Sequence, residues 1–180
     1  NITKSSPEVQ EIIKKMKELE YQGYQFEGAD GSFELLARKV IGRYKPFFHL
    51  HYYQTNGVNP RIEEGVCACA QIKVEVEGQI EVTAGEGDGP VNALDIALRK
   101  ALSRFYPAVE NIRLTDYKVR VLDGKSATAS RVRVLIESTD GKNTWTTIGV
   151  SSDVMEASWL ALCDSFEYKL ITDIEKHLGK

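Results

Sequence analysis

The amino-acid sequence repeats itself once, at a spacing of 64 residues, and this repeat limits what the chain can fold into more than any other feature. Five pairs of positions carry it: Gly85 and Gly149, Gly87 and Ser151, Ala93 and Ala157, Ala97 and Ala161, and Leu98 and Leu162. In each half, stretches that alternate apolar and polar residues precede a stretch with apolar residues at helical spacing. The repeat therefore predicts two units of one design, each with three antiparallel strands and a helix. A single unit would have too small a core to be stable alone.

Apolar periodicity places the strands and helices within each half. In the first half we expect strands over 47–53, 66–77 and 79–84, a polar loop over 56–65, and a helix over 90–106. In the second half we expect strands over 112–121, 128–137 and 144–149, turns at 123–124 and 140–141, and a helix over 154–174. Asp153 and Glu156 resemble a capping box at the start of that last helix. To extend the repeat upstream we match 68–70 with 127–129, which requires a longer hairpin in the second half.

Two further helices are predicted ahead of the strands, over 7–22 and 29–41, because apolar residues recur there at helical spacing and Gly23 and Gly42 follow them. We expect a helical linker subdomain over 1–44 and a duplicated domain over 45–180, divided into about 45–108 and 109–180. The expected fold class is α+β: two βββα units related by a pseudo-twofold axis, with antiparallel sheets packed on helices, preceded by the two-helix linker subdomain.

Composition excludes several classes of protein. The net charge of -3 argues against nucleic acid as the main partner. No apolar run reaches membrane-spanning length and the first residues do not resemble a signal peptide, so we expect a cytoplasmic protein with no membrane partner. The missing initial Met suggests a piece of a longer chain. Three cysteines, Cys67, Cys69 and Cys163, are expected to be small buried residues rather than disulfide or zinc partners.

A glycine-rich segment, Gly85-Glu86-Gly87-Asp88-Gly89-Pro90, joins a strand to a helix in the first half. Pro90 suits the first helical position, and the free N–H groups after it favour a negative group. A phosphate is one candidate, although the spacing is not G-x-G-x-x-G and Glu86 and Asp88 would repel a polyanion. A zwitterion fits better, with its carboxylate on the N–H groups and its ammonium beside an acidic side chain. A tight turn without any ligand is the remaining alternative.

We find no set of residues that indicates catalysis, and we expect neither a metal nor a cofactor in this chain. His49 and His51 share one face of a strand but lack a third ligand, and no G-x-S-x-G motif is present. A binding domain explains the sequence better than an enzyme does. Leu114, Tyr117 and Val121 on the 112–121 strand would suit a branched apolar ligand. Leu114 and Tyr117 point to opposite faces of a regular strand, so a bulge would be needed to bring them together, and both are otherwise ordinary core or sheet residues.

Several segments resemble the C-terminal regulatory domain of citramalate synthases and isopropylmalate synthases. They are Gly-Asp-Gly-Pro-Val-Asn-Ala-Leu-Asp at 87–95, Leu-Thr-Asp-Tyr-Lys-Val-Arg-Val at 114–121, the run at 145–150 and Glu-Ala-Ser-Trp at 156–159. Two of these motifs, Asp-Tyr-Lys-Val-Arg-Val at 116–121 and Glu-Ala-Ser-Trp followed by Ala161 and Leu162, look most like citramalate synthase. The segments at 19–27 and 29–36 resemble the linker that joins the family's catalytic barrel to its regulatory domain.

The resemblance implies a parent enzyme that condenses acetyl-CoA with pyruvate on a metal-dependent barrel absent here. This chain would be its feedback sensor, a homodimer that binds isoleucine, or leucine if the parent is an isopropylmalate synthase. A dimerisation module without a ligand is the further alternative. The family's effector contacts correspond to residues of the glycine loop, of the following strands and of the second-half loop: Gly87, Asp88, Gly89, Leu114, Tyr117, Val121, Ala129 and Ser151.

Overall fold

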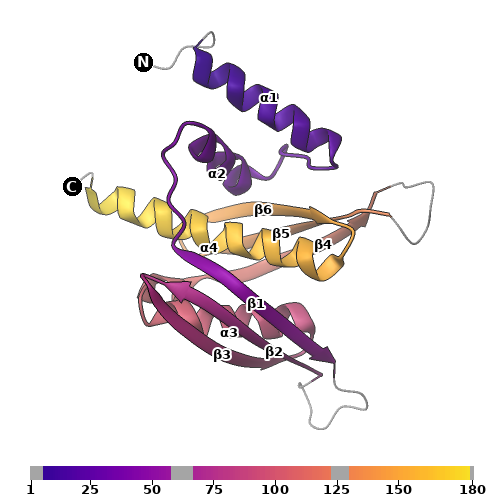
Figure 1. Cartoon of the computed structure of the whole chain (residues 1–180), viewed down its shortest axis with the longest axis vertical. Coiled ribbons are helices and arrows are strands. Elements are labelled where there is room, and N and C mark those ends of the chain that lie inside the picture. Colours follow the sequence, from indigo (N-terminus) through magenta and orange to yellow (C-terminus); the bar gives the residue numbers. More distant parts are fainter. Residues whose placement is uncertain (1–5, 58–66, 123–129, 179–180) are drawn as a thin grey trace. The chain divides into compact units, whose positions relative to one another are not determined.

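The computed structural model describes residues 6–57, 67–122 and 130–178 of the chain, with side chains up to Glu175. Its helices and strands, in chain order, are α1 (Pro7–Tyr21), α2 (Asp30–Val40), β1 (Phe48–Gly57), β2 (Ala68–Val76), β3 (Gln79–Gly87), α3 (Pro90–Ser103), the 3-10 helix η1 (Pro107–Asn111), β4 (Arg113–Val121), β5 (Val132–Thr139), β6 (Thr144–Ser151) and α4 (Val154–Leu178). They confirm the α+β class: two three-stranded antiparallel sheets, each packed on a helix, follow two N-terminal helices (Figure 1).

The chain forms two compact units, one made of residues 1–45 and 112–180 and the other of residues 46–111. We use the name 112–180 unit for residues 112–180 of the first, on which the N-terminal helices pack, and the name 46–111 unit for the second. The predicted pseudo-twofold axis and the predicted domain boundaries stay predictions. Among the described residues, no helix is both long and apolar enough to cross a membrane.

In the 46–111 unit, the strands lie in the order β1-β2-β3 and α3 covers one face of the sheet (Figure 1). The alternation of β2 explains this, because every second residue from Ala68 to Val76 is buried and the residues between them are not. Small side chains on α3, including Ala93, Ala97 and Ala101, are fully buried and let the helix approach the sheet closely. Gly85 is required for the same reason, since a Cβ there would lie 2.8 Å from the backbone nitrogen of Ala97.

The 112–180 unit repeats this design in the order β4-β5-β6, with α4 on the sheet (Figure 1). The spacing of 64 residues holds for the strand pairs without any gap. Ala70 lies opposite Gly85 as Val134 lies opposite Gly149. The predicted match of 68–70 with 127–129 is therefore wrong: Ala68, Cys69 and Ala70 correspond to Val132, Arg133 and Val134, and no longer hairpin is needed. That match relied only on the similar small residues in the two segments. The strand pairing shows which residues are equivalent.

The two N-terminal helices pack on the 112–180 unit, with α2 between α1 and β6 (Figure 1). Phe26, Ala29 and Leu36 form a buried cluster with Ile148 and Val150 of β6. This cluster lies on the sheet face that α4 leaves open.

Side chains of α2 also satisfy the outer edge of β6. The N–H group of Thr146 donates to Asp30 Oδ1 (3.0 Å), and that of Ile148 donates to Ser32 Oγ (2.9 Å). A strand edge without such partners would be open to pairing with another chain. The helix and the sheet are thus joined by hydrogen bonds as well as by apolar contact.

Several boundaries differ from the sequence-based expectations, among them those of β1, β5, α3 and α4. β1 runs on to Gly57, so the predicted polar loop begins too early, because polar side chains are tolerated on an exposed edge strand. β5 begins at Val132 rather than at 128, and α4 reaches Leu178. α3 ends at Ser103, and its chain continues into η1 at Pro107. The predicted turn at 123–124 lies outside the described residues.

Candidate functional site

The loop between β3 and α3 leaves the start of the helix without a capping side chain. Gly89 is the N-cap residue and has no side chain to offer, and Pro90 at the first helical position has no N–H group. The N–H groups of Val91 and Asn92 have no acceptor within the helix, because the first turn of any α-helix lacks them. This end of α3 therefore presents unsatisfied donors and the positive end of the helix dipole.

Asp88 lies directly beside these donors. Its carboxylate is exposed, and no Lys, Arg or His in the described part of the chain forms an ion pair with it. Its backbone is held on both sides: the N–H group donates to Asn92 Oδ1 (3.2 Å) and the carbonyl oxygen accepts from the thiol of Cys67. An exposed carboxylate next to free helix N–H groups suits a ligand that carries both an ammonium and a carboxylate.

The corresponding start of α4 is capped by side chains of its own. The N–H group of Met155 donates to Asp153 Oδ1 (2.7 Å), and that of Asp153 donates to Ser151 Oγ (3.1 Å). Ser151 in turn donates to the carboxylate of Glu156. The predicted capping role of Asp153 is confirmed, whereas Glu156 bonds to Ser151 rather than to the backbone of Asp153. The start of α4 thus has a side-chain cap that the start of α3 lacks.

A β-bulge on β4 brings the predicted strand residues to one face. Leu114 lies opposite Ser138 and Asp116 opposite Glu137, so Thr115 is the extra residue. Leu114 and Tyr117 consequently face the same side of the sheet as Ser138 and Ile136, the side covered by α4. Without the bulge they would point to opposite sides, as the sequence analysis anticipated.

Tyr117 is tied to α4 through its hydroxyl group. Tyr117 Oη lies 2.8 Å from Ser158 Oγ, and Ser158 donates its proton to Val154 O (2.6 Å), so Tyr117 donates to Ser158. The backbone N–H of Tyr117 donates to Asp116 Oδ1 (2.9 Å). A hydrogen bond from Lys118 holds the pKa of Asp116 below its usual value, so this carboxylate stays ionised. The ring of Tyr117 is still 40% exposed, which leaves it available to a ligand.

The structure brings some of the predicted site residues together. Val121 lies opposite Val132, which lies opposite Ser151, so these three residues form one row across the end of the sheet at which α4 begins. Val121 is 63% exposed. Leu114, Tyr117, Val121 and Ser151 therefore belong to the 112–180 unit, and Gly87, Asp88 and Gly89 belong to the 46–111 unit. Ala129 lies outside the described residues.

Two residues of this region were not anticipated from the sequence. Asn92 bonds back to the loop, and a Cβ on Gly87 would collide with its side chain, so glycine is needed at that position. A polar residue three positions after the N-cap is the usual signal for such a bond. Val119 is 45% exposed on the same face as Tyr117 and Val121 and extends the apolar row. The only feature of the sequence that could have indicated Val119 is its position two residues from both Tyr117 and Val121.

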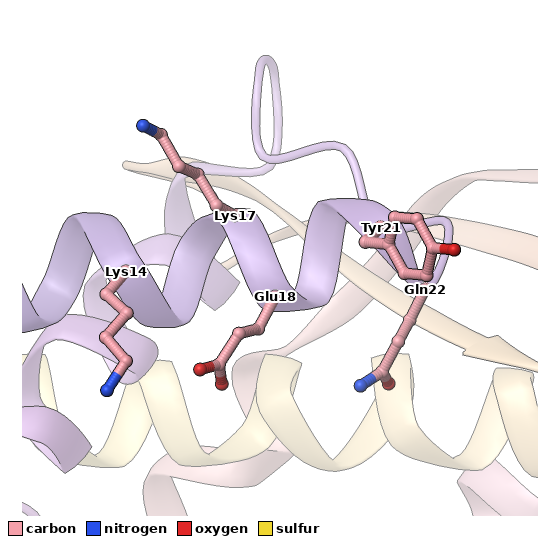
Figure 2. Close-up of a pocket in the computed structure, with 5 residues that line it drawn as sticks. All are labelled: Lys14, Lys17, Glu18, Tyr21 and Gln22. Carbon is pink, nitrogen blue, oxygen red and sulfur yellow. The ribbon is translucent and has the colours of Figure 1, made fainter.

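Other features of the surface are weaker candidates for a ligand site. Across the described ranges, no three His, Cys, Asp or Glu side chains gather closely enough to hold a metal ion. His51 lies 3.5 Å from Glu75 on the exposed edge of its sheet. A hollow on α1 is lined by side chains of that helix end alone, and Figure 2 shows Lys14, Glu18 and Gln22 on one side of the helix and Lys17 on the other. Tyr21, which also lines it, is 96% exposed, so nothing encloses a ligand there.

Comparison with known proteins agrees with this architecture. A family model described as the LeuA allosteric (dimerisation) domain matches residues 27–170. The (R)-citramalate synthase of Aquifex aeolicus is 47% identical over 175 residues, which are 97% of this chain and 33% of that protein. The (R)-citramalate synthase of Geobacter sulfurreducens is 49% identical over 164 residues, 91% of this chain and 31% of that protein.

A more distant relative is the 2-isopropylmalate synthase of Clostridium kluyveri, which is 29% identical over 170 residues, 94% of this chain and 30% of that protein. The chain thus spans about a third of the length of the curated relatives that it matches. The family model covers both sheets and both of the helices that pack on them. The chain therefore belongs to the family of LeuA allosteric (dimerisation) domains.

Proposed function

We propose that this chain is the feedback sensor of an (R)-citramalate synthase, that it forms a homodimer, and that isoleucine is its effector. The parent protein would condense acetyl-CoA with pyruvate in a catalytic barrel on the same chain, in the cytoplasm. The identity of 47% and 49% to two citramalate synthases, against 29% to an isopropylmalate synthase, supports isoleucine rather than leucine.

The observation that carries the proposal is the difference between the two helix starts. The start of α3 leaves donors free beside the exposed Asp88, whereas the start of α4 is capped by its own Asp153. We place the carboxylate of the effector on the free N–H groups after Gly87, Asp88 and Gly89, and its ammonium on Asp88. The aliphatic side chain of the effector would contact Leu114, Tyr117 and Val121 of β4, Ser151 of β6, and Ala129, which lies outside the described residues.

Such an effector regulates only if it binds one arrangement of the dimer better than another. We propose that isoleucine binding changes the arrangement of the dimer in this way. The helices α1 and α2 pack on the 112–180 unit, and we propose that they pass this change to the catalytic barrel.

The test is calorimetry of the chain with isoleucine, leucine and valine. Asp88→Ala removes the partner of the ammonium, a charged hydrogen bond of about 1.5–3 kcal/mol, and should weaken isoleucine binding about 10- to 100-fold. Glu110→Ala, which removes another exposed carboxylate of the same unit, is the matched control and should leave the affinity unchanged. An unaltered affinity in Asp88→Ala would remove Asp88 from the site. Absence of binding by all three amino acids, with no rise in melting temperature, would leave a dimerisation module without a ligand.

A further inference from the structure

A second pocket, remote in sequence from the glycine loop, lies where the N-terminal helices meet the 112–180 unit. It has a volume of about 190 Å³. α1, α2, β6 and α4 all contribute to its lining. Its apolar side is formed by aliphatic and aromatic side chains, among them Leu19, Phe26, Leu36, Ile148 and Leu160.

The polar end of this pocket consists of Ser32, Lys39 and Asp164. Ser32 Oγ accepts from the N–H of Ile148 (2.9 Å) and donates to Asp164 Oδ2 (2.6 Å), so both of its hydrogen-bonding roles are used within the protein. Asp164 Oδ1 has Lys39 Nζ at 3.7 Å, which is longer than a hydrogen bond. One carboxylate oxygen is thus fixed by Ser32 and the other faces a loosely placed cation.

The surroundings of Asp164 favour a donor closer to Oδ1 than Lys39 is. Burial raises the pKa of Asp164, against the attraction of Lys39 and the hydrogen bond from Ser32. A second, well-placed cationic donor would stabilise the ionised carboxylate in its apolar surroundings. Lys39 has room to move away from Asp164, because its side chain is 44% exposed. Its Nζ already lies 4.8 Å from the centre of the Tyr44 ring, which offers a further contact for the cation.

Three properties define the ligand that fits. It carries an ammonium for Asp164 Oδ1, a negative group for the displaced Lys39, and a short aliphatic group for the apolar walls. Pockets that combine apolar walls with a few convergent polar groups and a residue of shifted pKa are typical of small-molecule sites. We propose that this pocket binds a free amino acid with an aliphatic side chain, as a site separate from the glycine loop.

The position of the pocket suggests a consequence of binding. A ligand there would touch α2 together with β6 and α4, and would therefore strengthen the attachment of the N-terminal helices to the 112–180 unit. The inference shares with the proposed function only the class of ligand. It requires neither Asp88 nor a dimer.

Calorimetry of the chain with isoleucine and with valine tests the inference through the number of molecules bound per chain. We expect two binding events, one removed by Asp164→Asn and the other by Asp88→Ala. Leu160→Trp provides a second variant, because Leu160 is 38% exposed and a larger side chain there fills the pocket without disturbing the core. Glu18→Gln, an exposed carboxylate on α1, is the matched control and should retain both events. Melting curves establish that each variant is folded.

Each outcome decides one of the two sites. If Asp164→Asn and Leu160→Trp both keep every binding event of the unaltered chain, the pocket is not a site, whatever Asp88→Ala does. If the unaltered chain shows only one binding event, and that event is lost in these two variants and kept in Asp88→Ala, the pocket is a site and the glycine loop is not. An aliphatic amine without a carboxylate, such as 2-methylbutylamine, should bind at least about tenfold more weakly than isoleucine to the Asp88→Ala chain, because Lys39 then has no partner. Equal binding of the two would contradict the assigned role of Lys39.

Discussion

The two βββα units share one packing face and differ in the other. Where sheet and helix meet, the equivalent residues keep the same role. Thr83 Oγ1 donates to Ala97 O (2.6 Å), and Thr147 Oγ1 donates to Ala161 O (2.7 Å). Gly85 and Gly149 lie against the helix backbone in the same way. The inner face therefore retains what close packing of a helix on a sheet demands.

The outer faces of the sheets have diverged. On β3, Ala84 and Glu86 are exposed, whereas the equivalent residues of β6, Ile148 and Val150, are buried beneath α2 and the segment before it. The helix ends have diverged as well. Pro107 prevents α3 from continuing, and the residue 64 positions later, Ile171, is buried within α4. One unit has become a support for the N-terminal helices, and the other has kept an open loop.

The largest expected effect on stability concerns the inner faces, where each helix packs on its sheet. A Cβ at Gly85 would lie 2.8 Å from the backbone nitrogen of Ala97, and one at Gly149 would lie 2.9 Å from that of Ala161, so neither helix has room to move. We expect Gly85→Ala and Gly149→Ala each to lower the free energy of unfolding by about 3 kcal/mol, measured by urea denaturation. Gly57→Ala is the control, because no atom lies within 4 Å of an added Cβ there. A large effect in one unit only would show that the two inner faces are not equivalent.

A buried ion-pair cluster distinguishes the units next. Lys169 on α4 donates to Asp140 (2.7 Å) and Asp173 (2.8 Å), and both Lys169 and Asp140 are less than 10% exposed. The residue equivalent to Asp140 in the other unit is the fully buried Val76. Lys169→Met leaves Asp140 without its cation and should lower the free energy of unfolding at pH 7 by about 3 kcal/mol.

The same cluster predicts a difference in acid sensitivity. Burial alone would raise the pKa of Asp140, but hydrogen bonds from Lys169 and from the backbone of Asn143 and Lys142 outweigh it and hold the pKa well below its usual value. A lowered pKa contributes stability above about pH 4 that is lost as the pH falls further. The protection of backbone amides against hydrogen exchange, relative to the intrinsic rate at each pH, should therefore fall on acidification in β5 and β6 before it does so in β2 and β3. A simultaneous loss of protection in both sheets would contradict this.

The smallest effect concerns the shared threonine. Thr147 is fully buried and Thr83 is only partly buried, although they make the same hydrogen bond. Thr147→Val should cost about 1 kcal/mol of unfolding free energy, and Thr83→Val about half as much, because water replaces the lost bond more readily at Thr83. A larger loss of unfolding free energy in Thr83→Val than in Thr147→Val would mean that burial does not determine the contribution of this hydrogen bond.

The fold was largely predictable because its determinants are local and repeated. The alternation along β2, the helical spacing of alanines on α3 and the matching glycines at 85 and 149 are each visible in a short stretch of sequence. The failures have a physical cause too. β1 extends through Gln54 and Asn56, whose polar side chains show no alternation, because an edge strand does not need a buried face.

The candidate site was predictable only in part. The glycine loop and the need for a bulge on β4 follow from local backbone chemistry, and the bulge lies at Thr115. The pocket between Ser32 and Asp164 could not be predicted, since these residues are 132 positions apart and belong to no common pattern. At the start of α4 the cap by Asp153 was predictable from the sequence, whereas the hydrogen bond between Ser151 and Glu156 was not.

The hydrogen bonds from β6 to Asp30 and Ser32 limit how far the chain can be shortened before it aggregates. A truncated chain that starts at Pro46 would expose the outward N–H groups of Thr146 and Ile148 along a bare strand edge, next to an uncovered patch around Val150. Such edges recruit strands from neighbouring molecules. Light scattering should detect aggregates of the truncated chain at concentrations at which the longer one shows none. The N-terminal helices would thus protect the chain against aggregation through this strand edge, in addition to any part that they have in passing the regulatory change to the catalytic barrel.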